Sequence, residues 1–461
     1  MIGGVAVYLV RPAIAADPDG GVKLGPVTVH PSVTTGIEYR SNVYLSAGDY
    51  DPDVPGVEET VVSAPIWTLH PSLLAELDNR WLELGIQGDY YAKKFIDTKP
   101  NDGANITNLD RFSDFGLGVS LVGLRDRLVG FKVSNTSGID STPASVAKSE
   151  ADGSFVHTSN DLEGLISVRP GSALDLDVGG RVAYDQYDVP GALANSTTNE
   201  NYNDRIAYGP SMYATWRFLP KTAFVGAVSG VWTRWDRNVI ESLGLAELDV
   251  NTSAIQVGEF IAKPDSAGWR TRWGLRGQVT SKIGVGAELG YGQLYYDEAS
   301  LVGSNAANDA GGGYETDLTS FGEGLLVSAQ VVYTPLRGHT LTLGYLKDFQ
   351  DATFTNYSAY NFGFVRYEGR FIQKLTTTLE ASYRHDAYVG EVTRNDETPK
   401  ARLQLTYDVL KFLAVTGGGA WSQRACAGPF FGVSSGDACL GAFHSIQYDD
   451  FSANLGVTFS Y

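Results

Sequence analysis

The sequence predicts an all-β fold: a transmembrane antiparallel β-barrel of about 18 strands, with short periplasmic turns and long extracellular loops. Three observations lead to this prediction. Long stretches alternate apolar and polar residues with a period of two, the connections between them alternate between short and long, and the last stretch ends on an aromatic residue. A transmembrane strand needs about 9–11 residues to cross the hydrocarbon, whereas strands of soluble sheets usually have about 5–6.

The composition favours strands over helices. The 461 residues include 53 Gly, 25 Tyr and 20 Phe but only 2 Met, and the abundance of Thr, Val and aromatic residues is typical of sheets. The net charge of −18 argues against a nucleic-acid binder, which would carry a basic patch. No stretch approaches the roughly 18 apolar residues of a membrane helix. A helical bundle, a coiled coil and a P-loop enzyme therefore fit poorly.

Each stretch of alternation gives a strand one apolar face and one polar face. Over residues 172–187, for example, Leu176 and Val178 alternate with Asp175 and Asp177. We expect strands at about 26–42, 60–77, 80–97, 109–124, 127–139, 154–168, 172–187, 201–218, 221–235, 267–279, 282–296, 321–334, 339–353, 357–372, 374–388, 398–410, 411–424 and 445–461.

The connections support a barrel that spans the outer membrane. Short turns, such as 169–171 and 335–338, alternate with long connections, and only the connection near 354–356 is brief where a long one is due. Outer-membrane barrels have this asymmetry, and both of their termini lie on the periplasmic side when the strand number is even. The long connections are 43–59, 98–108, 140–153, 188–200, 236–266, 297–320, 389–397 and 425–444.

Soluble folds explain the pattern less well. A β-propeller repeats every 40–50 residues or so, and the chain has no such self-similarity. A closed sheet of about 16–18 strands leaves an aqueous channel that side chains cannot fill. Its apolar face must therefore point outward, where only lipid suits it, and closure leaves no unpaired backbone at membrane depth.

The N-terminus resembles the end of a secretory signal, so we expect residues 1–16 to be a signal-peptide remnant and 17–461 a single barrel domain. An apolar stretch, Ile2–Val10, precedes Pro12 and the small-residue segment Ala13–Ala16. The basic n-region of a signal is missing, which indicates that the true start lies upstream. The alternative is an apolar tail that belongs to the fold.

Two cysteines, Cys426 and Cys439, lie in a Gly/Ser/Pro-rich segment near the C-terminus. In an oxidising compartment they would most simply form one loop-closing disulfide. Two free buried thiols are the alternative. A metal site would need more ligands than this segment offers, because His444 is its only histidine.

We assign the polar face of each strand to the lumen. The strand over 267–279 then directs Arg270, Arg272 and Arg276 inward, and this ladder is our candidate for contact with anionic sugars, because Arg binds carboxylates bidentately. For any single charge the alternative is a solvated lumen residue that fixes strand register. The other candidate lumen residues are Arg181, Lys132, Arg384, Arg402, Glu83, Asp89, Asp175, Asp177 and Glu380.

No pattern predicts a cofactor or an enzyme. The acidic segment with Asp49, Asp51 and Asp53 fails the EF-hand rule, because Val54 and Thr60 occupy the sixth and twelfth positions. Two alternatives remain for this segment: a looser divalent-cation site or a solvated acidic loop. The G-x-S-x-G match at 432–436 lies in a loop between two cysteines and lacks the strand and helix that the motif needs.

Several motifs resemble a known family. Residues 36–44, with Tyr39-Arg40-Ser41-Asn42-Val43-Tyr44, resemble the first-strand motif of putative β-barrel porin 2, whose usual form is Tyr-Asp-x-Asn-Val-Tyr. Arg40-Ser41 departs from the acidic character of that motif. Residues 68–73 resemble the next element, and 333–396 resemble the C-terminal half of the family. The resemblance covers nearly the whole barrel.

The resemblance implies an outer-membrane channel that passes exopolysaccharide or capsule polysaccharide, with a periplasmic export component as partner. The alternatives are a general or solute-selective diffusion porin and a non-transport surface anchor or adhesin. Expected partners are outer-membrane lipid, lipopolysaccharide and the barrel assembly machinery, which would read the C-terminal Tyr461. No nucleic-acid partner is expected.

Overall fold

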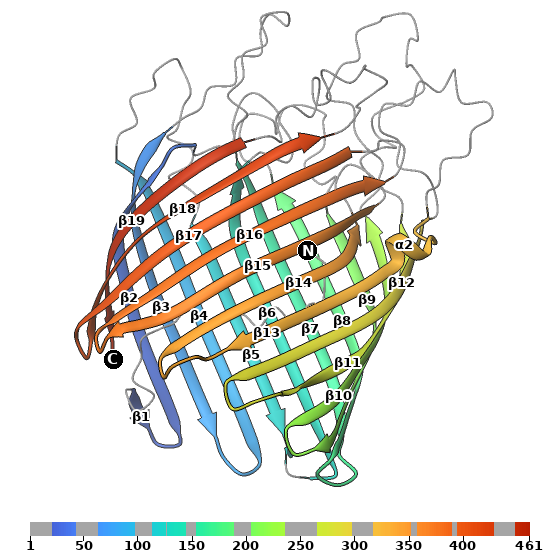
Figure 1. Cartoon of the computed structure of the whole chain (residues 1–461). Coiled ribbons are helices and arrows are strands. Elements are labelled where there is room, and N and C mark those ends of the chain that lie inside the picture. Colours follow the sequence, from blue (N-terminus) through green and yellow to red (C-terminus); the bar gives the residue numbers. More distant parts are fainter. Residues whose placement is uncertain are drawn as a thin grey trace, which may run out of the picture.

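The computed structural model describes residues 21–42, 63–96, 113–125, 127–143, 154–188, 204–235, 265–296, 317–351, 357–389, 394–427 and 448–461. These residues form a large antiparallel sheet that closes on itself (Figure 1). The described helix α2 has four residues, Phe321–Gly324. No described helix is long and apolar enough to span a membrane.

The strands are long, and most have 13–17 residues. Their bounds are β1 Val22–Leu24, β2 Val27–Arg40, β3 Ala64–Asp78, β4 Leu82–Phe95, β5 Asp114–Gly123, β6 Val129–Pro143, β7 Ser154–Val168, β8 Leu174–Asp188, β9 Arg205–Leu219, β10 Thr222–Trp235, β11 Ser266–Gln278, β12 Ile283–Tyr296, β13 Leu325–Tyr333, β14 His339–Asp351, β15 Tyr357–Ile372, β16 Leu375–Val389, β17 Arg394–Leu410, β18 Leu413–Ala427 and β19 Tyr448–Ser460.

The ring contains 18 strands, β2 to β19, as the sequence predicts. Each strand pairs with its neighbour in the chain, and β19 closes the ring by pairing with β2 from Ser452↔Arg40 to Ser460↔Ser32. The three-residue β1 pairs only with β2. Because the ring is closed, its strands pair their backbone groups with one another, as the interior of a bilayer requires.

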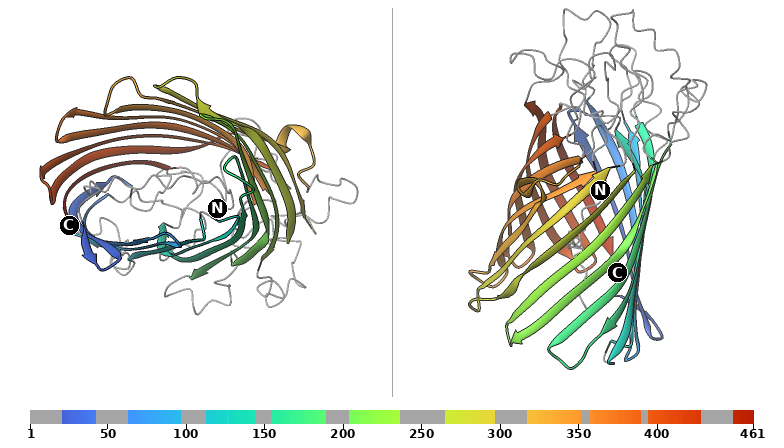
Figure 2. Two further views of the ribbon diagram at one scale, coloured as in Figure 1. Left: turned by 90° about the horizontal axis from the view of Figure 1, so that it is seen from below. Right: turned by 90° about the vertical axis from the view of Figure 1, so that its right-hand side faces the viewer.

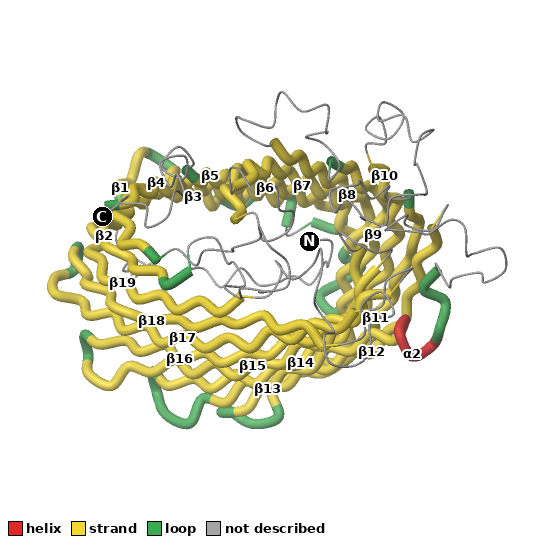
Figure 3. Tube along the Cα trace, turned by 90° about the horizontal axis from the view of Figure 1, so that it is seen from above, coloured by secondary structure: helices red, strands yellow, loops and turns green. Residues whose placement is uncertain are grey.

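The barrel is oval in cross-section (Figures 2 and 3). Strands β3–β8 form one long side, β13–β18 form the other, and β9–β12 form the tightly curved end between them. Helix α2 lies outside the wall at this end.

The two faces of the wall differ as the alternation predicts. Along β8, Val178, Val182 and Tyr184 are 50%, 44% and 40% exposed. On the other face of the strand, Asp177 pairs with Lys132, and Arg181 pairs with Asp161. The same alternation recurs around the ring, and large exposed apolar side chains occupy one face of each wall strand. This face suits lipid, because a sheet in a bilayer turns its apolar side chains to the acyl chains.

Turn chemistry explains why the short connections are short. Gly171 and Gly338 adopt positive φ angles of 93° and 82°, a conformation that glycine reaches without a steric penalty. In the β3–β4 turn, the Asn79 side-chain oxygen accepts hydrogen bonds from the backbone N–H groups of Trp81 and Leu82 at 2.8 and 2.9 Å. Such side-chain bonds replace missing backbone partners in turns.

Besides β6, which runs on to Pro143 inside the expected connection 140–153, two segments differ from the sequence prediction. The expected strand over 321–334 begins with helix α2, and only Leu325–Tyr333 pair as a strand. The expected long connection 389–397 is shorter, because β17 begins at Arg394 and Asp396 pairs with Asp386. The charged residues of 389–397 are typical of a loop. Asp396 is nevertheless fully buried, in an ion pair with Arg424.

Three predictions fall on residues outside the described ranges. They concern the signal-peptide remnant at 1–16, the acidic segment with Asp49, Asp51 and Asp53, and the disulfide partner Cys439. All three stay predictions.

Candidate functional site

The polar face of the wall lies on the inside of the barrel. At the end of β14, Asp351 accepts hydrogen bonds from Thr233 on β10 at 3.2 Å, Ser266 on β11 at 3.1 Å and Tyr296 on β12 at 2.9 Å. Neighbouring strands lie about 4.8 Å apart, so β10 and β14 would be about 19 Å apart along a flat sheet. Side chains can bridge that span only across the concave side of a bent wall.

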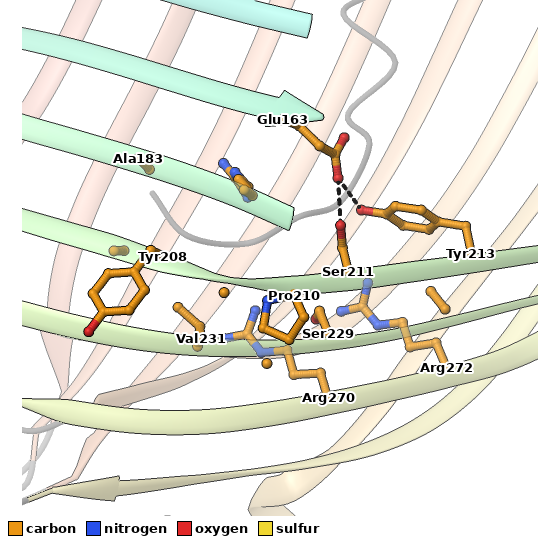
Figure 4. Close-up of a pocket in the computed structure, with 15 residues that line it drawn as sticks. Glu163, Ala183, Tyr208, Pro210, Ser211, Tyr213, Ser229, Val231, Arg270 and Arg272 are labelled. Atoms are coloured by element: carbon orange, nitrogen blue, oxygen red, sulfur yellow. Dashed lines mark hydrogen bonds between the residues drawn. The ribbon is translucent and has the colours of Figure 1, made fainter. Parts of the chain in front are cut away.

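The curved end encloses a small recess on this inner face (Figure 4). Glu163, Arg181, Ser211, Arg270 and Arg272 are among its lining residues. The Glu163 carboxylate accepts hydrogen bonds from Tyr213 at 2.9 Å and Ser211 at 3.2 Å. The recess brings side chains of β7, β8, β9, β10 and β11 together, although they are far apart in the sequence.

The predicted arginine ladder lies on the inner face of β11, but its members are held by two carboxylates and a backbone carbonyl. Arg272 donates to the fully buried Asp348 at 2.6 Å, and Arg270 donates to the Phe349 carbonyl at 2.7 Å. Arg276 donates to Glu288 at 2.9 Å. The side chains of Arg270 and Arg272 are each only 13% exposed. These two arginines therefore brace the curved end of the wall, and contact with an anionic sugar stays a prediction.

Most other predicted lumen charges also form pairs across the inner face. Exposed pairs of this kind contribute roughly 0–1 kcal/mol each to stability, so they fix register more than they stabilise the fold. The pairs between different segments are Lys132–Asp177, Arg181–Asp161, Arg217–Asp175, Arg366–Glu380 and Arg125–Glu83. Arg384 pairs with Asp386 within β16, and the His70 ring lies 3.8 Å from the Asp89 carboxylate.

Two inward cations on β17 lack a carboxylate partner among the described residues. Arg402 lies opposite Glu380 in the strand register, but Glu380 binds Arg366, and Arg402 donates to the side-chain oxygen of Gln404 at 2.6 Å. The exposed Lys400 lies opposite Ser382 on β16 and Ser422 on β18. These two cations place positive charge without an ion-paired carboxylate on the inner face of β17.

The facing wall is rich in acids. Lys93, Lys132, His157 and Arg181 are the inward basic residues of the described parts of β4–β8. The inward carboxylates of the same strands include Glu83, Asp89, Asp114, Asp161, Glu163, Asp175, Asp177 and Asp185. Because β4–β8 and β15–β17 lie on opposite long sides of the oval, the charge distribution sets up a field across the lumen.

An aromatic surface on the inner wall does not follow from the alternation of apolar and polar residues. Phe362 and Phe364 of β15 share a face with Arg366, whereas Val365 on the other face is 43% exposed to the outside. The polar-inside rule fails here, because Asn361 and Gly363 occupy the outer face. The charges Arg366 and Glu368, in phase with the two rings, are the sequence signal that identifies the inner face.

Exposed aromatic side chains mark the outer face near strand ends. Trp216, Trp232 and Tyr295, for instance, are 52%, 46% and 41% exposed. Tyr91 instead points inward, because its hydroxyl donates to Glu38 at 3.2 Å. Outward aromatic rings at this level suit the membrane interface.

Comparison with known proteins identifies a family. A family model described as putative beta-barrel porin 2 matches residues 157–429, more than half of the chain. The segments 36–44 and 68–73 lie outside this match. None of the curated proteins matches the chain.

Solved structures with similar architecture are distant in sequence. OpdQ of Pseudomonas aeruginosa has 11% identity and a TM-score of 0.42, with 94% of this chain and 97% of that chain covered. A BenF-like porin from Pseudomonas fluorescens Pf-5 has 13% identity and a TM-score of 0.44, with coverages of 95% and 100%. The FrpB iron transporter from Neisseria meningitidis has 8% identity and a TM-score of 0.44, with coverages of 94% and 82%.

Proposed function

The chain belongs to the putative beta-barrel porin 2 family, and we propose that it is a solute-selective diffusion porin and not an enzyme. It is an outer-membrane protein of a Gram-negative bacterium. The observation that carries the proposal is the closed 18-strand ring with a polar, ion-paired inner face and an apolar outer face. A barrel of this strand number leaves an aqueous channel, through which small solutes diffuse.

The opposed walls give the channel a basis for selectivity. Glu163 on β7 is held by hydroxyl groups on one long side, and Lys400 and Arg402 lie on the other. Rings and walls of charged side chains select ions by their field in channels. A solute with separated charges would orient along this field as it passes.

Ion selectivity in planar bilayers tests the proposal. We expect discrete conductance steps from the purified barrel and a reversal potential, under a KCl gradient, that responds to single charges. Glu163→Gln should shift selectivity toward anions and Lys400→Gln toward cations, because each removes one lumen charge. Glu397→Gln is the matched control: it removes a carboxylate on the outer face beside Tyr383 and should leave the reversal potential unchanged.

A barrel that inserts but never conducts would contradict the porin proposal and favour a surface anchor or adhesin. A shift toward cations in Glu163→Gln, or toward anions in Lys400→Gln, would contradict the charge assignment. A shift of equal size in the Glu397→Gln control would contradict it too. Polysaccharide passage, which the resemblance implies, has no contact among the described residues that favours it over small solutes, so we propose the diffusion channel in its place.

The membrane partners follow from the same proposal. The apolar outer face would contact lipid and lipopolysaccharide, and the terminal strand β19, with the exposed aromatic side chains Phe451, Phe459 and Tyr461, would be read by the barrel assembly machinery.

A further inference from the structure

Two aromatic rings lie next to each other on the inner wall. Phe362 and Phe364 stack side by side, with ring centroids 5.7 Å apart and ring planes 29° from parallel. Phe364 lies directly over Gly344 of β14, where an added Cβ atom would come within 2.1 Å of the ring. Because glycine leaves room, the ring lies against the wall and turns a face to the lumen.

A cation lies two strands away from this aromatic surface. The register places Phe364, Ser382 and Lys400 in one row across β15, β16 and β17. With strands about 4.8 Å apart, Phe364 and Lys400 are separated by about 10 Å at the backbone. Because the Ser382 side chain between them is short, it leaves space for a solute on the inner face.

The charges around this row favour an anion. Lys400 has no carboxylate partner among the described residues, and Arg402 lies one inward position farther along β17. Arg384, one inward position from Ser382 on β16, keeps Asp386 as its partner at 2.6 Å. The positive charge available to a solute therefore lies on the Lys400 side of the row, and the aromatic surface lies on the other.

We propose that the row Phe364–Ser382–Lys400 is a binding subsite for a small solute that combines a six-membered ring with a carboxylate. The ring of the solute stacks on Phe364 and Phe362, and its carboxylate reaches across Ser382 to the Lys400 ammonium group. This inference rests on the proposed porin function and names the class of solute. Sugar acids and apolar ring acids share the required chemistry.

Four probes separate the parts of this recognition. Glucuronate and cyclohexanecarboxylate carry both ring and charge, glucose carries only the ring, and acetate carries only the charge. Titration calorimetry of the folded barrel in detergent measures binding without any need for conductance, and block of single-channel current measures binding in the bilayer. We expect both ring acids, or one of them, to bind at least about tenfold more tightly than glucose and acetate.

Variants test the two halves of the row. Lys400→Gln should weaken ring-acid binding about tenfold, because a charge-assisted hydrogen bond is lost. Phe364→Leu keeps an apolar side chain but removes the ring face, and should weaken binding about threefold. Two controls should change binding less than twofold: Lys93→Gln removes a cation on the opposite wall, and Phe451→Leu alters an outward side chain.

The outcomes are distinguishable. Binding of glucuronate alone identifies sugar acids as the source, and binding of cyclohexanecarboxylate alone identifies apolar ring acids. Acetate binding as tight as that of the ring acids, or binding that neither Lys400→Gln nor Phe364→Leu weakens, would overturn the subsite. If the ring acids bind in detergent but the barrel never conducts, the subsite stands and the porin function fails.

Discussion

At the scale of single residues, Asp348 holds the curved end of the barrel together. Its carboxylate is fully buried, accepts from Arg272 at 2.6 Å and from the Phe349 N–H at 2.8 Å, and lies 3.9 Å from Arg270. Asp348→Asn would leave two mostly buried guanidinium groups beside a neutral amide. We expect the free energy of unfolding, measured by urea titration in lipid vesicles, to fall by about 3–5 kcal/mol.

The matched control is Glu288→Gln. Glu288 pairs with Arg276 on the same strand as the other two arginines, but the Arg276 side chain is 51% exposed. An exposed pair contributes about 0–1 kcal/mol, so this variant should be nearly as stable as the wild type. Equal losses in the two variants would contradict the special role of Asp348.

The sequence predicts which residues face inward better than it predicts their partners. The inward face of Glu380 and Arg402 follows from alternation, and the register even sets these two residues opposite each other. Glu380 nevertheless binds Arg366 on the other side. Partner choice depends on rotamers and on charges of both neighbouring strands, which alternation does not encode.

At the scale of secondary-structure elements, helix α2 shortens the wall, because β13 begins only after it, at Leu325. β14 pairs with β13 only as far as Lys347, and the fully buried Phe349 lies farther along, with its ring against Gly292 of β12. Phe349 belongs to a buried cluster with Leu294, Leu318 and Leu326. Apolar packing thus seals the wall where the strand pairing stops.

Phe349→Ala should therefore destabilise the barrel. Removal of a fully buried phenylalanine ring costs about 3–5 kcal/mol, because a cavity remains. Phe371→Ala is the control: Phe371 is 62% exposed on the outside, and lipid chains can fill the space that its ring leaves. The same urea titration compares the two variants, and a Phe371→Ala loss as large as that of Phe349→Ala would contradict the sealing role.

The sequence contains a signal for α2 that the two-residue alternation hides. Ser320 caps the helix by accepting from the Glu323 N–H at 3.4 Å, and the spacing Ser-x-x-Glu is the signature of a capping box. Gly322 and Gly324 weaken any strand at the same place. By contrast, long uninterrupted strands such as β8 and β16 match their predicted ranges to within a residue or two.

At the scale of the whole molecule, closure of the ring follows from the sequence but the shape of its cross-section does not. The even number of strands and the short and long connections predict an antiparallel ring with nearest-neighbour pairing. The oval outline brings β7, which carries Glu163, to the side opposite β17, which carries Lys400. That placement depends on where the wall bends, and the bend in turn depends on buried contacts such as those of Asp348 and Asp351.

The central claim is that the apolar face of this wall touches acyl chains and the polar face lines water. Fluorophores attached to single cysteines, introduced after Cys426→Ser and Cys439→Ser, test it in vesicles of brominated lipid. Labels at Val182 on β8 and Trp421 on β18 should be strongly quenched, because both side chains face outward. Labels one residue farther along, at Ala183 and Ser422, should be quenched little. Equal quenching within each pair, or stronger quenching at Ala183 and Ser422, would contradict the account.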